Sequence, residues 1–270
     1  MLISVIVTTY NRPKALDRVL SALSEQEDRD FEVIVGDDGS REETGLLVRQ
    51  WAGRFPVALK HAWQEDRGFR AARVRNLAAS EASGEYFLFL DGDCVPQRHW
   101  VSRHRGLAEP GWMVAGNRVL LSERFTARVE DEKISLPDLG AMEIGRLVMR
   151  KDLNRLLPLV SIPTSLFRKI GAGRWQKVRT CNLGVWREDF ERINGFDQVF
   201  SGWGYEDTDL AVRLLNSGVR HKSGAFATCV FHLYHPENDR SNRDANFIRV
   251  MDRLKSGVTQ AEIGFRELKK

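Results

Sequence analysis

SVIVTTYNRPKALDRVLSALSEQEDRDFEVIVGDDGS, residues 4–40, holds two short apolar runs separated by a segment with a helical pattern. The segment repeats apolar side chains at the three- and four-residue spacing of one helix face, at Leu16, Val19, Leu20 and Leu23. Asn11 and Pro13 are residues typical of a helix start. Each apolar run predicts a strand, so the order strand, helix, strand predicts a parallel pair joined by a crossover helix.

The same alternation continues along the next fifty or so residues. Two helical segments, REETGLLVRQWA (41–52) and ARVRNLAASEAS (72–83), flank the extended segment VALKHAW (57–63), and YFLFLDGD (86–93) is a buried strand that runs into a turn. In a parallel sheet the ligand crevice lies beyond the carboxyl ends of the strands. Three polar strand ends are therefore expected to converge there, at residues 8–11, 37–40 and 91–93.

The bulk composition is that of a soluble globular protein, with 42% hydrophobic and 29% charged residues. The net charge of +4 is only mildly basic, and no arginine-rich tract or aromatic RNP-like motif accompanies it, so no nucleic-acid partner is expected. A phosphorylated or membrane-surface partner suits this charge better. The first apolar run has no basic region before it, and no stretch approaches the ~20 apolar residues of a membrane span. We expect a cytoplasmic protein, with peripheral association at the inner membrane face left open.

The three cysteines, Cys94, Cys181 and Cys229, lie far apart in sequence and form no CxxC pair. Their odd number and wide spacing argue against a disulfide framework and against a structural zinc site. We expect reduced cysteines in the core.

Asp91-Gly92-Asp93 follows a continuous apolar strand, so its two carboxylates are delivered on a tight turn. Two acids at this spacing can hold a hard divalent cation that also binds a diphosphate. Taken alone, the pattern is more typical of a surface turn than of a metal site, and its interpretation depends on the rest of the chain.

The rest of the chain resembles a known family. SVIVTTYNRPKALDRVLSAL (4–23), FEVIVGDDGS (31–40) and RNLAASEASGEYFLFLDGDCVP (75–96) resemble the nucleotide-binding half of family 2 glycosyltransferases with the GT-A fold. NLGVWREDFERINGFDQVFSGWGYEDTDLAVRLLNSGVR (182–220) and HLYHP (232–236) are similar to the acceptor half of β1,4-galactosyltransferases and bacterial chondroitin-type polymerases.

The resemblance implies an α/β GT-A fold, with a Rossmann-like nucleotide-binding mixed sheet flanked by helices and an acceptor-side C-terminal half. The expected boundaries are 1–110 for the nucleotide-sugar half, 111–240 for the acceptor half with a basic insertion at about 122–179, and 241–270 for a C-terminal helical tail. It also implies an inverting, metal-dependent transferase that moves a sugar from a UDP-sugar to a hydroxyl of an acceptor glycan or glycolipid, in bacterial surface polysaccharide or lipopolysaccharide synthesis.

By this resemblance Thr8, Tyr10 and Asp38 surround the base, and the Asp38 carboxylate accepts a hydrogen bond from the uracil ring N–H. Cytosine has no donor at that ring position, so the carboxylate favours UDP. A solvated Asp-Asp-Gly turn is the alternative for this segment. Arg75 and Asn76 match a family motif, and Arg70 and Arg73 lie about one turn earlier, where they are candidates for the phosphates. The nucleotide contacts expected are Thr8, Tyr10, Arg12, Asp38, Arg70, Arg75, Asn76, Asp91 and Gly92.

The resemblance also implies a metal site. Asp93 is the direct ligand, and Asp91 holds the ribose or reaches the metal through water. His235 aligns with a histidine ligand of the galactosyltransferases, and His232 stands where they have methionine. A carboxylate and imidazole set with diphosphate oxygens suits Mn²⁺ somewhat better than Mg²⁺.

GWGYEDTD (202–209) supplies the expected acceptor side. Asp207 aligns with the family's catalytic base, Glu206 is expected to bind acceptor hydroxyls, and Asp209 to hold the loop or the acceptor. Trp203 and Gly204 offer a flat apolar surface and a close-packed turn. Helix capping explains one of the acids but not the tryptophan between two glycines. No motif calls for the nucleophile that a retaining enzyme needs.

The segment from Arg146 to Arg179 carries nine Lys or Arg against one acid. It is either a solvated helical insertion with an apolar inner face, or a surface that faces the acceptor or a membrane. A second amphipathic stretch with Phe247, Ile248, Met251 and Leu254 at helical spacing is open to core packing or to lipid contact.

Two other functions remain open. A sugar nucleotidyltransferase also uses an α/β sheet and metal-binding acids, but it needs a glycine-rich phosphate loop, which TTYNRPKA (8–15) is not. A non-catalytic glycan- or nucleotide-sugar-binding module of the same fold has no need of the DGD, WGYED and HLYH motifs together.

Overall fold

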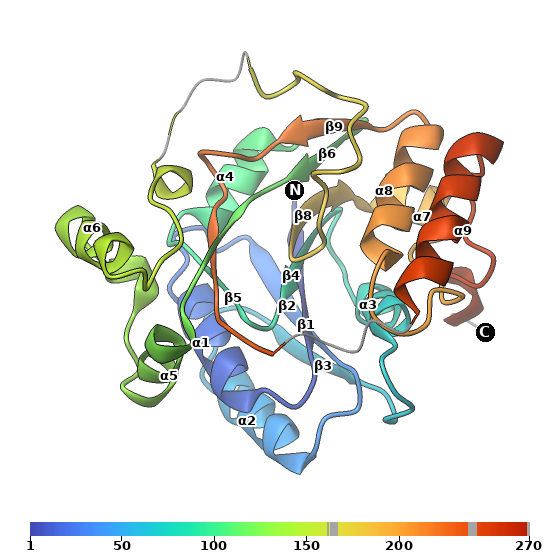
Figure 1. The fold of residues 1–270 in the computed structure, drawn as a ribbon. Coiled ribbons are helices and arrows are strands. Elements are labelled where there is room, and N and C mark those ends of the chain that lie inside the picture. Colours follow the sequence, from blue (N-terminus) through green and yellow to red (C-terminus); the bar gives the residue numbers. More distant parts are fainter. Residues whose placement is uncertain (161, 163–166, 237–241, 269–270) are drawn as a thin grey trace.

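The computed structural model describes residues 1–160, 162, 167–236 and 242–268. A seven-stranded mixed sheet runs through the middle of the molecule, in the strand order β3-β2-β1-β4-β8-β6-β9 (Figure 1). Its strands are β1 (Ile3–Thr9), β2 (Phe31–Asp37), β3 (Leu59–Trp63), β4 (Tyr86–Asp91), β6 (Trp112–Ala115), β8 (Asn182–Trp186) and β9 (Arg220–Ser223). A smaller sheet has the order β5-β10-β7, from β5 (Cys94–Pro96), β10 (Val230–His232) and β7 (Arg118–Leu120).

Three helices of the first half lie where their apolar spacing predicts them: α1 (Pro13–Ser24), α2 (Glu42–Ala52) and α3 (Ala71–Ser80). α4 (Trp100–Leu107) is a helix that the sequence patterns above do not predict. The later ones are α5 (Glu123–Asp131), α6 (Ala141–Met149), α7 (Arg187–Arg192), α8 (Glu206–Asn216) and α9 (Arg243–Ser256), with 3₁₀ turns η1 (Leu136–Asp138), η2 (Leu157–Leu159) and η3 (Arg266–Leu268).

Both faces of the sheet are covered, so alternate strand residues enter two different cores. Val5 and Val7 of β1 pack with α1, α2 and α5, whereas Ile6 between them packs with α3, α7 and α8. Strands buried on both faces read as continuous apolar runs rather than as alternating ones. This explains the run ISVIV at the start of the chain.

The register of the parallel strands brings the polar strand ends together. β1 pairs in parallel with β2 and β4, and Thr8 lies opposite both Gly36 and Asp91. The predicted convergence of the three strand ends is therefore confirmed. β8 then joins β4 in antiparallel pairing, and β6 and β9 extend the sheet beyond it, so the second half completes the same mixed sheet.

The C-terminal segment is more than the helical tail that the sequence suggests. α9 packs beside α8 (Figure 1). Between residues 257 and 268, the last described part of the chain, there is no further α-helix, and Phe265 is buried against Phe190 with ring centroids 5.6 Å apart. The amphipathic stretch is divided: Leu254 packs on a small core, but Ile248 is 61% exposed.

The basic insertion is only partly helical. α6 and the short turn η2 are its regular elements between Arg146 and Arg179 among the residues that the structure describes. Arg168 is buried and donates to the carbonyls of Ser223 and Ala225, so this cation is structural. None of the described helices combines the length and the apolar character needed to cross a membrane.

Candidate active site

A cavity of about 1040 Å³ opens at the carboxyl ends of β1 and β4. It is lined by residues from both halves of the chain. The expected site residues that line it are Thr8, Tyr10, Arg12, Asp38, Arg75, Asp91, Gly92, Asp93, Trp203, Gly204, Glu206, Asp207, His232 and His235. Of the residues expected at the site, the cavity lining lacks Arg70, Asn76 and Asp209.

Gly92 holds the two carboxylates of the DGD turn against the end of β1. Its N–H donates to the carbonyl oxygen of Thr8 at 2.7 Å. A Cβ atom at this position would lie 2.9 Å from that same oxygen, closer than real Cβ atoms come. A side chain at residue 92 would push the turn away from Thr8, so this close approach requires glycine.

The smaller sheet carries the histidine pair to Asp93. β10 pairs with β5 so that His232 lies opposite Cys94, and the N–H of Leu233 donates to the carbonyl oxygen of Asp93 at 2.9 Å. The Nε2 atom of His232 is 3.5 Å from Asp93 Oδ1, and that of His235 is 3.6 Å from Asp93 Oδ2. Each oxygen of one carboxylate therefore faces one imidazole.

The burial and hydrogen bonding of these imidazoles suit metal binding. Burial lowers the pKa of His232 to about 4, so its ring is neutral at pH 7. The ring Nδ1 of His235 lies 2.7 Å from the carbonyl oxygen of Pro236 and donates to it, since that oxygen can only accept, and this orients Nε2 toward Asp93. The guanidinium of Arg12 donates to Asp93 Oδ2 at 2.9 Å and supplies a cation at this carboxylate. The donor set fits a divalent cation.

Arg75 has a different position from the phosphate contact expected of it. Its guanidinium is buried and bridges two acids, donating to Asp91 at 3.2 Å and to Glu206 at 3.1 Å. Burial raises the pKa of Asp91 and of Glu206, and Arg75 opposes both shifts. This residue of α3 thus links the DGD turn to the start of α8.

Asp38 lies in the cavity wall with its carboxylate already held from two sides. Gln64 donates to one oxygen, and the main-chain N–H of Arg70 donates to the other at 2.8 Å. Burial raises the pKa of the carboxyl. Each carboxylate oxygen has a second lone pair, so Asp38 can still accept a hydrogen bond from a ligand.

The start of α8 is formed by a strained turn. Tyr205 has φ 72°, a left-handed conformation that is rare for a side chain of its size, between Gly204 (φ 107°) and the first residue of the helix. The turn delivers Glu206 to Arg75 and Asp207 to the cavity. Thr208 donates to Asp207 Oδ1 at 3.2 Å, and Arg179 lies 3.9 Å from Oδ2.

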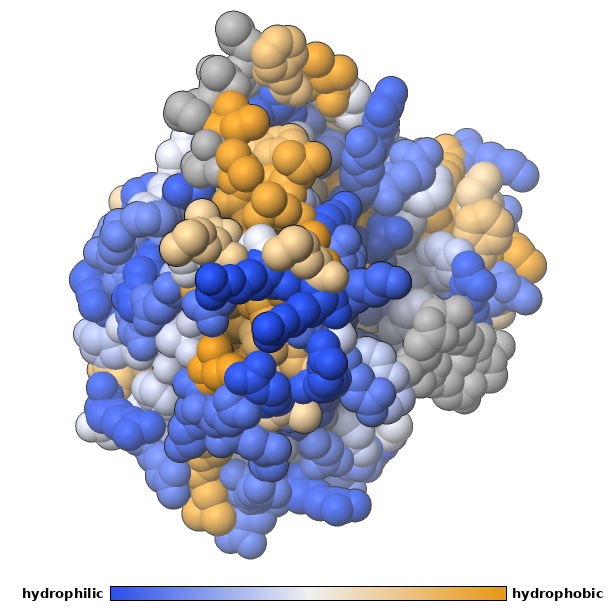
Figure 2. Space-filling model, turned by 60° about the vertical axis from the view of Figure 1, so that its left-hand side comes forward, coloured by the Kyte–Doolittle hydropathy of each residue, from blue (hydrophilic) through white to orange (hydrophobic). Residues whose placement is uncertain are grey.

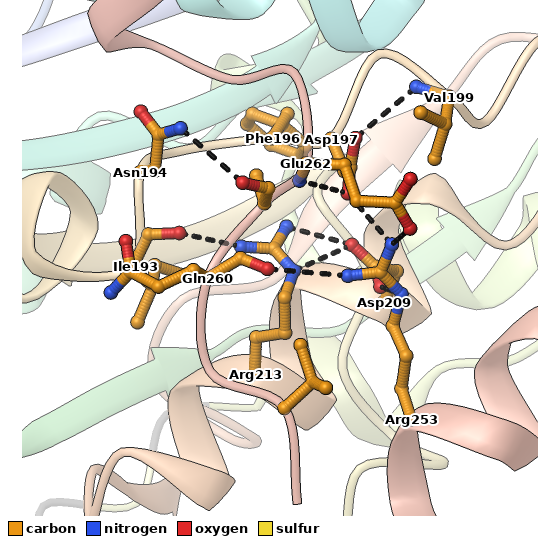
Figure 3. Close-up of polar contacts among 12 residues, drawn as sticks. Ile193, Asn194, Phe196, Asp197, Val199, Asp209, Arg213, Arg253, Gln260 and Glu262 are labelled. Atoms are coloured by element: carbon orange, nitrogen blue, oxygen red, sulfur yellow. Dashed lines mark hydrogen bonds and ion pairs between the residues drawn. The ribbon is translucent and has the colours of Figure 1, made fainter. Parts of the chain in front are cut away.

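Asp209 is not an acceptor-binding residue in this structure. Its side chain is fully buried on the inner side of α8, where Arg213 donates to it at 2.8 Å and Arg253 of α9 lies 3.1 Å away (Figure 3). Burial raises the pKa of its carboxyl and Arg213 opposes this. Of the two roles expected for it, the structure leaves only holding the loop.

Asn76 and Arg70 also have structural partners. Asn76 donates to the carbonyl of Phe196 at 2.8 Å and accepts from the N–H of the same residue at 2.9 Å. The side chain of Arg70 donates to the carbonyl of Glu65. The expected nucleotide contact of Asn76 is therefore wrong, because both ends of its buried amide are used within the protein.

Other residues of the cavity were not singled out from the sequence. They include Phe69, Arg118 and Arg243. Cys181 is expected only in the core and Arg179 only at the end of the basic segment, yet both line the cavity. Arg118 is the first residue of the short edge strand β7, between Asn117 and Val119. No local pattern in the sequence marks it.

Comparisons with known proteins agree with this geometry. A family model described as glycosyl transferase family 2 matches residues 4–169, and one described as the N-terminal domain of galactosyltransferase matches residues 170–236. Validoxylamine A glucosyltransferase of Streptomyces hygroscopicus subsp. jinggangensis is 34% identical over 81% of this chain and 52% of its own length. Chondroitin synthase of Pasteurella multocida is 26% identical over 80% of this chain and 23% of its own. The chain thus spans about half of the first relative and less of the second.

Solved structures share the fold at low identity. The 1–349 fragment of S. aureus TarS in complex with UDP-GlcNAc has a TM-score of 0.67 and 18% identity, covering 99% of this chain and 69% of its own. A mannosyltransferase from Pyrobaculum calidifontis, in complex with GDP-Man and Mn²⁺, has a TM-score of 0.62 and 21% identity over 94% of this chain and 64% of its own.

Proposed function

Because this chain belongs to glycosyltransferase family 2 and has the GT-A fold, we propose that it transfers the sugar of a UDP-sugar to a hydroxyl group of an acceptor glycan, with inversion at the anomeric carbon. The observation that carries the proposal is the meeting of three motifs in one cavity: the DGD turn, the histidine pair and the acidic start of α8. The DGD turn and the histidine pair are more than a hundred residues apart in the sequence, so no local pattern accounts for their convergence.

The donor occupies the side of the cavity nearest β1 and β4. Beside Arg75, which is tied to two acids, Arg12 and Arg118 line the cavity together with Asp91 and Asp93, and guanidinium groups suit diphosphate oxygens. Asp38 and Tyr10 line the same cavity. The free lone pairs of the Asp38 carboxylate match the ring N–H of uracil, which supports UDP as the nucleotide.

Asp93, His232 and His235 would hold the divalent cation, Mn²⁺ or Mg²⁺. When bound, this ion supplies positive charge to the leaving diphosphate. The mixture of carboxylate and imidazole favours Mn²⁺. Asp91, tied to Arg75 at 3.2 Å, is then left for the ribose or for a water molecule.

Asp207 is the base that takes the proton of the acceptor hydroxyl. It lies in the cavity with Arg179 at 3.9 Å as its nearest cation, a distance too long for a hydrogen bond. Glu206 has the opposite environment, because its carboxylate is buried and held by Arg75. A base needs an accessible lone pair aimed at the substrate, and this supports Asp207. Trp203 lines the cavity beside it and offers an apolar face to the acceptor sugar.

The test compares Asp207→Asn with Glu206→Gln. Asp207→Asn keeps the shape but removes the base, so transfer is expected to fall by ~10²–10⁴-fold while UDP affinity changes little. Glu206→Gln breaks a buried ion pair, so it is expected to lower the melting temperature as well as the activity. Transfer at the wild-type rate by Asp207→Asn, with a loss of turnover alone in Glu206→Gln, would assign the base to Glu206. Product anomers read by NMR decide between inversion and retention.

The insertion with α5 and α6 carries a surface suited to an anionic membrane, which supports a glycolipid acceptor in bacterial surface polysaccharide or lipopolysaccharide synthesis. Figure 2 turns the side of α5 and α6 toward the viewer and shows apolar surface beside long hydrophilic side chains. The most exposed large apolar residues between positions 141 and 170 are Met142, Met149, Leu157, Phe167 and Ile170. A pocket of about 470 Å³ between these helices is lined by Arg124, Arg128, Arg150 and Asp152. Arginines next to apolar side chains are the combination that binds anionic lipid headgroups.

A further inference from the structure

Two of the three cysteines meet behind the DGD turn. Cys94 opens β5 directly after the turn, and Cys181 lies immediately before β8. Both are free and buried. The ligand atoms of Asp91, Cys94 and Cys181 all lie within 4.8 Å of one another. The proposed transfer reaction uses neither thiol.

Cys94 also belongs to a second group of ligand atoms. Its sulfur lies within 4.8 Å of the ligand atoms of Asp93 and His232, and its S–H points to Asp93 Oδ1 at 3.7 Å. A cation bound at the two sulfurs therefore has the carboxylate of Asp91 within reach as a third ligand, and a water molecule can complete a four-coordinate shell. Two sulfurs with oxygen or nitrogen ligands are a donor set that zinc and cadmium prefer and that Mg²⁺ and Mn²⁺ do not.

We propose that Asp91, Cys94 and Cys181 form a binding site for a thiophilic divalent cation of the Zn²⁺ or Cd²⁺ class, adjacent to the site of the hard cation that serves the donor. The site is open to such an ion, because Asp91 and Cys181 both line the cavity. On binding, the two thiols release their protons to solvent, and the two sulfurs replace water molecules of the hydrated ion, which also leave to solvent. Arg118 donates to Cys181 Sγ at 3.5 Å and places a positive charge beside this sulfur.

Occupancy of this site inhibits transfer, and this consequence rests on the proposed function. An ion held by the sulfurs takes Asp91 away from the donor and lies against Asp93, where the cation for the diphosphate is expected. Excess Mn²⁺ does not reverse the inhibition, because a hard cation competes poorly for sulfur. Addition of a stronger chelator or of a thiol reverses the inhibition.

The binding test uses the whole chain with Cd²⁺, whose bonds to sulfur give an ultraviolet absorption that its bonds to oxygen and nitrogen do not. Titration in the presence of saturating Mn²⁺ is expected to give one equivalent of bound Cd²⁺ with this absorption. Cys94→Ser and Cys181→Ser are each expected to weaken it at least tenfold. Cys229→Ser is the matched control, since Cys229 is also buried and free but belongs to neither group of ligand atoms among the described residues.

The outcomes separate this inference from the proposed function. Absorption that is missing in the wild type, or that is unchanged in Cys94→Ser and Cys181→Ser, overturns the site. X-ray absorption of the zinc form of the wild type decides the matter if a variant folds poorly: two sulfur ligands near ~2.3 Å support the site and none overturns it. If the protein binds Cd²⁺ through both sulfurs but transfers no sugar, the metal site is supported and the proposed function is contradicted.

Discussion

Replacement of Arg253 tests whether the buried ion cluster between α8 and α9 holds the start of α8. The Nη2 atom of Arg253 lies 2.7 Å from Asp197 Oδ2, and its Nε lies 3.1 Å from Asp209 Oδ1 (Figure 3). Both acids are fully buried. Arg253→Met keeps most of the apolar stem but removes the cation, and it leaves two buried carboxylates with fewer partners.

The expected loss follows from the contacts that remain. Asp197 keeps the main-chain N–H groups of Glu262 at 2.8 Å and Ile263 at 3.3 Å, and Asp209 keeps Arg213. Breaking a buried ion pair costs about 3–5 kcal/mol, and the remaining donors put this case at the low end, about 3 kcal/mol. An unfolding entropy of roughly 2.1 cal/mol/K per residue, applied to the 270 residues of this chain, converts that loss to a fall in Tm of about 5 °C.

Thermal unfolding monitored by circular dichroism measures this loss. The control is Arg249→Met, on the same helix, because Arg249 is exposed. Its effect is expected to stay within about 0.5 kcal/mol. If Arg253→Met and Arg249→Met melt at the same temperature as the wild type, the cluster does not stabilise the packing of α9 on α8, and the reasoning fails.

Three further predictions concern the ligands. Chelation of divalent cations is expected to abolish transfer, and Asp93→Asn to weaken UDP binding with Mn²⁺ in calorimetric titration, whereas full activity in chelator would contradict the metal site. UDP is expected to raise Tm more than CDP or GDP at equal concentration, because of Asp38; equal shifts would count against uracil. The protein is expected to co-sediment with anionic vesicles at low salt and to be released from them at high salt. The Arg150→Glu variant is expected to bind these vesicles more weakly than the wild type. Absence of the wild type from the vesicle pellet at low salt would exclude the lipid surface.

Much of the fold could be predicted from the sequence because its signals are local. The apolar runs at 3–8 and 86–91 became buried parallel strands, and the helical spacing after Pro13 became α1. The family resemblance and the GT-A fold are confirmed as well. The C-terminal segment could not be predicted in the same way, because the burial of Phe265 depends on a distant partner, Phe190.

The site was predicted less completely, for the same physical reason. A motif shows which side chains are available but not which of them pair with each other. Asp209 looked like its neighbours in sequence, yet it lies on the inner side of α8 against Arg213. Cys94 and Cys181 looked unrelated, since strand pairing of β4 with β8 is what brings their segments together. Long-range pairings of this kind are set by topology and not by local composition.

Arg75 shows how the two halves of the site are coupled. One guanidinium touches Asp91, on the side proposed for the donor, and Glu206, on the side proposed for the acceptor. Because the cation is buried, it is costly to leave either carboxylate without it. Any shift of the DGD turn therefore acts on the start of α8 through a single side chain. Asp207, the next residue, has no such tie and remains open to the cavity. Two adjacent acids thus have different environments, because Arg75 of α3 forms an ion pair with only the first of them.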